Sequence, residues 1–447
     1  MLNPVSRKIL TILFLGALLA VALRLIHGIV VERQARQQEV EAGIAAGSGG
    51  RQSVVGPLLL AQVRDPPSVI PAQAGKPATV GASTVRLLHV LPDTLEVAGA
   101  VEVRPRHRGI YRAQTFRLDG TWQGRFRVPA RFGLPAQSGS SIERVFVVFA
   151  VADPRGLRGR PALRLDGRTQ TLAAGTSVPV LGDGFRVELD PAALAAGGDL
   201  GFALQLSLEG TGSLSVVPSG DDTRIALRSN WPHPSFEGAF LPGERSLAAD
   251  GFSATWQTTL LATNLDGRLA GCLQRGTGPC ELPGIGVRFV EPVNVYQRSE
   301  RAVKYGLLFI GLTFGAFFLF ETLKRCRMHP LQYAFVGLAL ALFFLLVISL
   351  SEHVAFALAY GAAATACVLL VTVYLRYVLG GWRRALGFGA LLALLYGVLY
   401  GLLVSEDNSL VLGSVLLFAL LAAAMWLTRR VDWYTAGEAR RQPADAA

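Results

Sequence analysis

The chain has 447 residues, of which 51% are hydrophobic and only 17% are charged; its mean hydropathy is +0.39. This composition excludes an intrinsically disordered protein, which has few apolar residues, and is too apolar for an ordinary soluble one. The formal net charge of +11 often indicates a nucleic-acid partner, but here the basic residues gather beside apolar segments, so we predict none. Four cysteines are too few for a small fold held by disulfides.

Six apolar segments are long enough to form membrane-spanning helices, because a helix needs about twenty residues to cross the hydrocarbon core. Helices are the expected form, since strands with open edges would leave backbone groups unpaired in lipid. The predicted spans are Ile9–Val31, Val303–Leu323, Leu331–Leu350, Val354–Tyr374, Ala385–Val404 and Leu410–Leu427.

The first span leaves two interpretations open. Ala20-Val21-Ala22 resembles a signal peptidase site. The apolar pattern nevertheless continues through Val31 into a polar, helix-like stretch, Glu32–Ile44. We therefore favour an uncleaved anchor at residues 9–31, with cleavage as the alternative.

The connections between the spans differ in charge. Connections on one side contain the basic residues Arg7, Lys8, Lys324, Arg325, Arg327, Arg376, Arg383, Arg384, Arg429, Arg430, Arg440 and Arg441. The alternate connections, residues 351–353 and 405–409, contain neither Lys nor Arg. Because basic loops stay in the cytoplasm, we predict cytoplasmic termini at residues 1–8 and 429–447. A five-helix bundle would then occupy residues 303–428, with residues 32–302 outside.

Residues 32–302 form a region of different composition, dominated by period-two alternation of apolar and polar residues. Thr94–Val103, Ile142–Val151 and Ala254–Leu261 are examples, and the pattern is typical of half-buried strands. No long amphipathic helix interrupts them, so we predict an all-β domain of antiparallel sheets packed as a sandwich. The Pro/Ala-rich segment 62–83 is expected to be flexible.

Two cysteines, Cys272 and Cys280, lie close together in the outer region. An oxidising compartment and a short intervening loop favour a disulfide between them. Two free thiols are the alternative, and zinc is less favoured because no second Cys or His pair flanks them. We predict no metal site and no cofactor.

Glu352 and His353 are the most notable ionisable pair, because they lie in a three-residue turn between two spans. They could bind a cation, relay protons or titrate near neutral pH; the alternative is that they only end and cap helices. Glu406 and Asp407 lie on the same side and could join them, or simply form a solvated loop.

Charged residues are otherwise scarce in the spans. Glu321 lies near the end of its span and is expected to pair with Lys324 and Arg325. Asp, Glu, Lys, Arg and His are absent midway through the five later spans. This disfavours an ion-coupled transporter, which needs such groups inside the bundle.

Two stretches of the outer region could form binding surfaces. Trp231, His233 and Phe236 lie in a segment with two prolines, so the aromatic rings could stack on a sugar or a partner; the alternative is a rigid corner whose rings fill the core. Arg104–Arg108 could meet anionic headgroups or an anionic polymer, or form a solvated edge strand.

Several short stretches also match one known family, in order and along nearly the whole chain. They are Gly49–Gln52 with Gly56-Pro57, Arg108–Tyr111, Asn230–Phe236 with Phe240–Pro242, Val287–Val293 with Tyr296, Arg301–Gly306, His329–Tyr333 and Ser349–His353. On these residues the chain resembles the CreD family of inner-membrane, cell-envelope-integrity proteins. The resemblance implies a multi-spanning bacterial inner-membrane protein with a periplasmic domain and a role in cell-wall stress, and implies no established chemistry.

The predicted membrane spans and the outer strand-rich region are compatible with two functions. The first is a non-enzymatic envelope protein, embedded in the bilayer, that binds or scaffolds a periplasmic component through residues 32–302. The alternative is an integral-membrane enzyme or carrier for a lipid-linked envelope precursor at the outer leaflet, with Glu352 and His353 as acid/base groups or metal ligands. The chain contains no phosphate-binding loop, zinc-protease motif or nucleophile elbow, so we favour the first.

Overall fold

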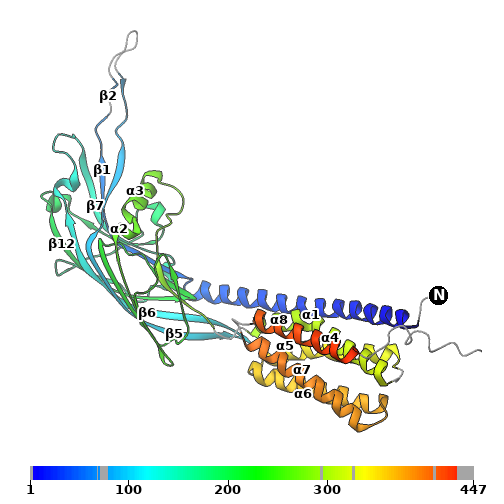
Figure 1. Cartoon of the computed structure of the whole chain (residues 1–447). Coiled ribbons are helices and arrows are strands. Elements are labelled where there is room, and N and C mark those ends of the chain that lie inside the picture. Colours follow the sequence, from blue (N-terminus) through cyan, green and yellow to red (C-terminus); the bar gives the residue numbers. More distant parts are fainter. Residues whose placement is uncertain are drawn as a thin grey trace, which may run out of the picture. The chain divides into compact units, whose positions relative to one another are not determined.

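The computed structural model describes residues 4–67, 69–70, 79–291, 295–324, 328–405 and 409–429. The chain forms two compact units, one made of Met1–Arg36 with Val293–Ala447 and the other of Gln37–Pro292. The first unit consists of apolar helices, and the second is rich in strands (Figure 1). This confirms the predicted helical membrane protein with a large strand-rich insert.

The helices of the first unit follow the predicted spans. They are α1 (Pro4–Ser48), which continues into the second unit, α4 (Val295–Lys324), α5 (Pro330–Ser351), α6 (Phe356–Val378), α7 (Trp382–Val404) and α8 (Ser409–Thr428). Among the described residues, five helices (α1 and α4 to α7) are long and apolar enough to cross a membrane. The sixth predicted span coincides with α8, which contains a shorter apolar run, Val411–Ala423.

The start of α5 explains one of the matching sequence stretches. His329 is its N-cap, and its side chain accepts a hydrogen bond from the backbone N–H of Leu331. The side-chain oxygen of Gln332 in turn accepts a hydrogen bond from the backbone N–H of His329. Pro330 occupies the first turn, where a missing N–H costs nothing. The sequence His-Pro-Leu-Gln therefore encodes a capping box.

Helix α1 packs into a seam of small residues on α4 and α5. Leu19 and Leu23 are buried, together with Ile26 and Val30 further along the same helix face. A Cβ added at Gly337 would lie 2.2 Å from Cδ1 of Leu19, and one at Gly306 would lie 3.1 Å from Leu23. The side chains of Leu19 and Leu23 therefore fill the space beside these two glycines and join α1 to α4 and α5.

Two eight-stranded sheets make up most of the second unit. The first has the order β10-β11-β7-β1-β13-β18-β15, with β4 paired to β1. Its strands are β1 (Gln52–Arg64), β4 (Val85–Val90), β7 (Ser141–Val151), β10 (Ala173–Ala174), β11 (Gly184–Leu189), β13 (Ser213–Val216), β15 (Pro234–Gly238) and β18 (Ile285–Phe289).

The second sheet has the order β16-β17-β14-β5-β6-β12-β8-β9. Its strands are β5 (Pro92–Arg108), β6 (Tyr111–Val128), β8 (Ala162–Leu165), β9 (Arg168–Thr169), β12 (Gly198–Thr211), β14 (Asp222–Ser229), β16 (Glu244–Ala248) and β17 (Gly251–Thr259). Four short 3-10 helices connect strands, η1 (Ala130–Gly133), η2 (Pro154–Gly156), η3 (Pro179–Leu181) and η4 (Pro191–Leu194).

One continuous core lies between the two sheets. It contains Trp122 and Trp256 from the second sheet and Phe149 from the first. Phe116 of β6 packs on Phe289 of β18 with ring centroids 5.1 Å apart, which joins the two layers directly. The layered arrangement is the one expected of a sandwich.

The pairing is not purely antiparallel, and in this respect the prediction is wrong. Strand β1 runs parallel to β13, and β14 runs parallel to β5. Alternation has the same period in either direction, so the pattern of residues could not distinguish the two.

Parts of the segment 62–83, which we predicted to be flexible, belong to strands. Residues 62–64 belong to β1 and pair with β4 and β7, and β2 (Val69–Ile70) pairs with β3 (Thr79–Val80). Residues 71–78 lie outside the described residues. Proline and alanine obscured the strand pattern here, and β1 alternates little because both of its faces are buried.

A small helical subdomain, α2 (Leu260–Thr263) and α3 (Leu265–Arg275), covers part of the first sheet. Leu269 and Cys272 of α3 pack on Leu58 and Leu60 of β1 in a second apolar cluster. We predicted no long amphipathic helix in this region, and α3 is a short one of 11 residues. Only three apolar residues of α3 face the sheet, which is too short a pattern to stand out in the sequence.

Candidate functional site

Glu352, the leading sequence candidate, lies at the C-terminal end of α5 with its side chain only 10% exposed. Its Oε1 is 3.4 Å from Nε of Arg33 on α1, and the hydroxyl of Tyr296 on α4 donates to it over 3.3 Å. Both partners come from helices distant in sequence. An ion pair with a hydrogen-bond donor neutralises the carboxylate and fixes it in place, which suits a structural role better than proton transfer.

The other members of the predicted acidic group do not share this environment. His353 is exposed in the turn before α6. Glu406 and Asp407 lie outside the described residues. Within the described part of the chain, no group of three or more His, Cys, Asp or Glu residues is placed to hold a metal ion.

A second buried carboxylate, Glu321, lies at the opposite end of the bundle, near the end of α4. Lys8 of α1 pairs with it, the hydroxyl of Tyr333 donates to it over 3.1 Å, and the backbone N–H of Met328 donates over 3.3 Å. We expected pairing with Lys324 and Arg325, whose side chains lie outside the described part of the chain; the cation that the structure describes beside Glu321 is Lys8.

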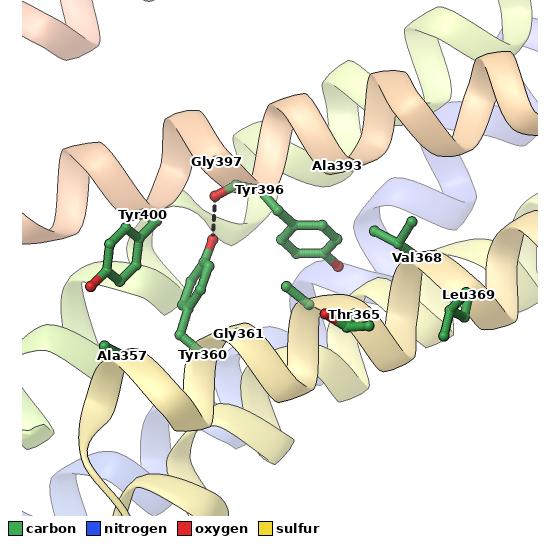
Figure 2. A pocket seen from close by; sticks show the side chains of 11 residues that line it. Ala357, Tyr360, Gly361, Thr365, Val368, Leu369, Ala393, Tyr396, Gly397 and Tyr400 are labelled. Carbon is green, nitrogen blue, oxygen red and sulfur yellow. Dashed lines mark hydrogen bonds between the residues drawn. The ribbon is translucent and has the colours of Figure 1, made fainter.

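A cavity of about 540 Å³, open to the surroundings along one side, lies between α6 and α7. Figure 2 shows its lining side chains, with Ala357 and Tyr400 toward one end and Leu369 toward the other. Small residues create the space at one-turn intervals, Ala357 and Gly361 on α6 and Ala393 and Gly397 on α7. None of the lining residues is charged.

Tyrosines form the polar part of this cavity. The hydroxyl of Tyr360 donates to the backbone oxygen of Tyr396 over 2.7 Å (Figure 2), and the hydroxyl of Tyr396 donates to Sγ of Cys367 over 3.1 Å. The Cys367 thiol in turn donates to the backbone oxygen of Ala339. These groups are committed to helix–helix bonds, so the cavity is suited to binding rather than to nucleophilic chemistry.

The cavity and the Arg33–Glu352 contact were not predicted. Helices far apart in the sequence contribute to both, so no local motif marks them. The spacing of small residues in α6 and α7 was the signal available, because small residues four apart in a span commonly line a helix interface.

The aromatic corner of the strand-rich unit faces inward for the most part. The indole N–H of Trp231 donates to the backbone oxygens of His233 and Val290, both at 3.1 Å. The ring of Phe236 lies edge-on to Phe252 at 5.6 Å and to Trp256 at 5.7 Å. His233 is exposed, whereas Trp231 and Phe236 are partly buried against the core.

The two cysteines of this unit are joined. A disulfide links Cys272 at the end of α3 to Cys280, with Cα atoms 5.6 Å apart. Both residues belong to the second apolar cluster. The bond therefore holds the segment after α3 against the sheet.

Asp153 organises the start of β1, where the stretch Gly49–Gln52 begins. Its carboxylate accepts hydrogen bonds from the Arg155 side chain at 2.7 and 2.9 Å and from the backbone N–H of Gly50 at 3.0 Å. Gln52 donates to the backbone oxygen of Asp153 over 3.0 Å. The Arg155 side chain, with the backbone donors, lowers the pKa of Asp153 to about 2.

The low pKa of Asp153 predicts acid sensitivity. The pKa of Asp153 in the folded protein lies below its value near 3.9 in the unfolded chain. The ionised carboxylate therefore stabilises the folded state fully above pH ~4, and this stabilisation is lost as the pH falls through about 2. It amounts to about 2 kcal/mol. Unfolding free energies of the wild type and Asp153→Asn, measured from pH 7 to pH 2, should differ by that amount at pH 7 and converge in acid. The exposed Asp199→Asn should show no such convergence, and a constant Asp153→Asn difference would contradict the account.

Comparison with known proteins agrees with this architecture. The family described as Inner membrane protein CreD matches residues 4–434. The chain is also 37% identical over 432 residues to Inner membrane protein CreD of Escherichia coli (strain K12), covering 97% of this chain and 94% of that protein. Both matches extend over the helical unit and the strand-rich unit, and they confirm the resemblance seen in the short sequence stretches. The chain thus belongs to the CreD family of inner membrane proteins.

Proposed function

We propose that this protein supports the cell envelope as a non-enzymatic binding protein, with the strand-rich unit in the periplasm. The basic connections between spans favour this orientation. Apolar helices flank the strand-rich unit in the chain, α1 before it and α4 after it, so the unit is held at a membrane through both of its ends.

The proposed binding surface is the outer face of the second sheet. Register places Arg224, Glu96 and Gln123 side by side on neighbouring strands, followed by Ala203 and Arg164. All five side chains are exposed. The result is an exposed row across five strands, in which four of the five side chains are polar or charged.

Arginines without ion-pair partners on this face favour an anionic partner. Among the described residues, no carboxylate lies within ion-pair distance of Arg164, Arg224 or Arg228, whereas Arg125 and Arg127 share Asp93. Free guanidinium groups bind carboxylates and phosphates strongly because they donate in pairs. An anionic component of the envelope is therefore the partner we propose.

The test replaces three arginines of the face together, as Arg164→Gln, Arg224→Gln and Arg228→Gln. Purified full-length protein should then co-sediment about tenfold less with isolated cell-wall sacculi, since each lost charge-assisted contact weakens binding. Cells relying on this variant should lose resistance to a cell-wall-directed antibiotic. The matched control, Arg160→Gln with Arg168→Gln and Arg268→Gln, removes three exposed arginines elsewhere on the unit.

Two results would overturn the proposal. One is equal sedimentation of the face variant and the control variant. The other concerns orientation: a cysteine at the exposed position Ala203 should react with a membrane-impermeant thiol reagent added outside sealed spheroplasts. Reaction only from the cytosolic side would place the face in the wrong compartment.

A further inference from the structure

We infer that the cavity between α6 and α7 binds the hydrocarbon chain of an anionic lipid, whose phosphate lies at the N-terminus of α6 beside Arg298. This site goes beyond the proposed function, because it belongs to the helical unit and does not depend on the sheet face.

The cavity has the properties of a site for an apolar chain. Its volume of about 540 Å³ falls within the range of small-molecule sites. Glycine and alanine line it on both helices, and a Cβ added at Gly361 or Gly397 would meet nothing within 4 Å. The space is thus open beside those glycines, in helices whose surroundings are hydrocarbon.

One end of the cavity coincides with the N-terminus of a long helix. Ala357, which lines the cavity, is the second residue of α6, and no side chain caps this terminus. The first N–H groups of a helix have no partner within it and carry the positive end of its dipole. Together they form a favourable position for a phosphate.

A cation lies at the same terminus. The Arg298 guanidinium of α4 is 5.7 Å from the ring centroid of Phe356, the first residue of α6. The Phe356 ring is 6.1 Å from that of Tyr360, which lines the cavity. Phe356 therefore lies between the positive charge and the apolar space.

This charge is not neutralised by the protein. Among the described residues, no carboxylate lies within ion-pair distance of Arg298, and its buried Nε has no hydrogen-bond acceptor. Glu352, a few residues before α6, is already paired with Arg33. An uncompensated cation at a membrane helix end is costly, and an anionic headgroup removes that cost.

The helix terminus, Arg298 and the cavity together favour one kind of ligand. A lipid phosphate with a long chain uses the helix terminus, Arg298 and the cavity together. A helix of a second copy would fill the cavity but would leave the charge unpaired. The chemistry is shared by bulk anionic phospholipids and by polyprenyl phosphates, so the experiment separates these two sources.

The test measures lipid binding to the purified full-length protein by native mass spectrometry. The probes are palmitoyl-oleoyl phosphatidylglycerol, a polyprenyl monophosphate and, as the zwitterionic reference, palmitoyl-oleoyl phosphatidylcholine. We expect at least one anionic probe to bind about tenfold more tightly than the reference. Arg298→Gln should remove that preference, and Arg298→Lys, which keeps the charge, should retain most of it.

Two further variants, one inside the cavity and one outside it, test whether the cavity binds the lipid chain. Gly397→Leu places a side chain into the cavity and should weaken binding of all chains about tenfold. Gly387→Leu lies on the same helix, also has open space around its Cβ, and does not line the cavity, so it should bind normally.

The outcomes are distinguishable. Preference for phosphatidylglycerol identifies bulk phospholipid as the source, and preference for the polyprenyl phosphate identifies a lipid-linked precursor. An unchanged preference in Arg298→Gln would overturn the headgroup assignment. Equal binding by Gly397→Leu and Gly387→Leu, or a loss of dimers instead of lipid in Gly397→Leu, would overturn the cavity assignment.

Discussion

Glu321→Ala is expected to lower the free energy of unfolding of the helical unit by about 2–3 kcal/mol, somewhat less than breaking a fully buried ion pair costs, because this pair is partly buried. The variant leaves the Lys8 ammonium without its carboxylate. It also removes the acceptor for the Tyr333 hydroxyl and the Met328 N–H. Lys8 and Glu321 are only 26% and 13% exposed, so water compensates little. The measurement is an SDS titration of the purified protein followed by circular dichroism.

A double variant separates the ion pair from general damage at this site. Lys8→Met with Glu321→Met removes both charges and replaces them by apolar side chains, so it should be clearly more stable than Glu321→Ala. Glu32→Ala provides the matched control, because Glu32 pairs with Arg36 at the surface and should cost less than about 1 kcal/mol. A double variant that is as unstable as the single one would show that the charge pairing is not the cause.

The second large effect is expected at Phe236. Its ring packs edge-on to Phe252 and Trp256 and is partly buried against the shared core, so Phe236→Ala should remove this packing and cost the strand-rich unit about 2 kcal/mol. Guanidinium unfolding followed by tryptophan fluorescence measures this loss. His233→Ala, an exposed change three residues earlier, should stay within about 0.5 kcal/mol.

These two variants also show whether the aromatic segment around Trp231, His233 and Phe236 binds a partner or only fills the core. If Phe236→Ala weakens envelope resistance while the unfolding transition stays in place, the ring belongs to a binding surface. The core packing of Phe236 leads us to expect the opposite, a loss of resistance that follows the loss of stability.

The sequence predicted the parts of the fold that rest on local periodicity. Apolar length located α4 to α7 and α8, and alternation located most long strands, such as β5 and β7. Parallel pairing of β1 with β13 was missed, because alternation carries no direction. Strand β1 alternates little at Leu58–Ala61 since α3 covers its outer face, and α3 itself is too short to show a clear helical period.

The candidate site was harder to predict for a different reason. Charge patterning singled out Glu352 and Glu321, but it suggested neighbours in the sequence as partners. Their cations, Arg33 and Lys8, both come from α1. In a membrane unit, a rare ionisable group is paired by whichever helix packs against it, and local sequence does not show which helix that is.

The Lys8–Glu321 pair has a consequence for the order of synthesis. The two residues are separated by 313 positions, with the entire strand-rich unit between them. Since chains are made from the N-terminus at about 5–20 residues per second, α1 exists for roughly 15–60 seconds before its counter-ion has been translated. Lys8 therefore remains without Glu321 through most of translation. The helices of the membrane unit can complete their packing only late in biogenesis.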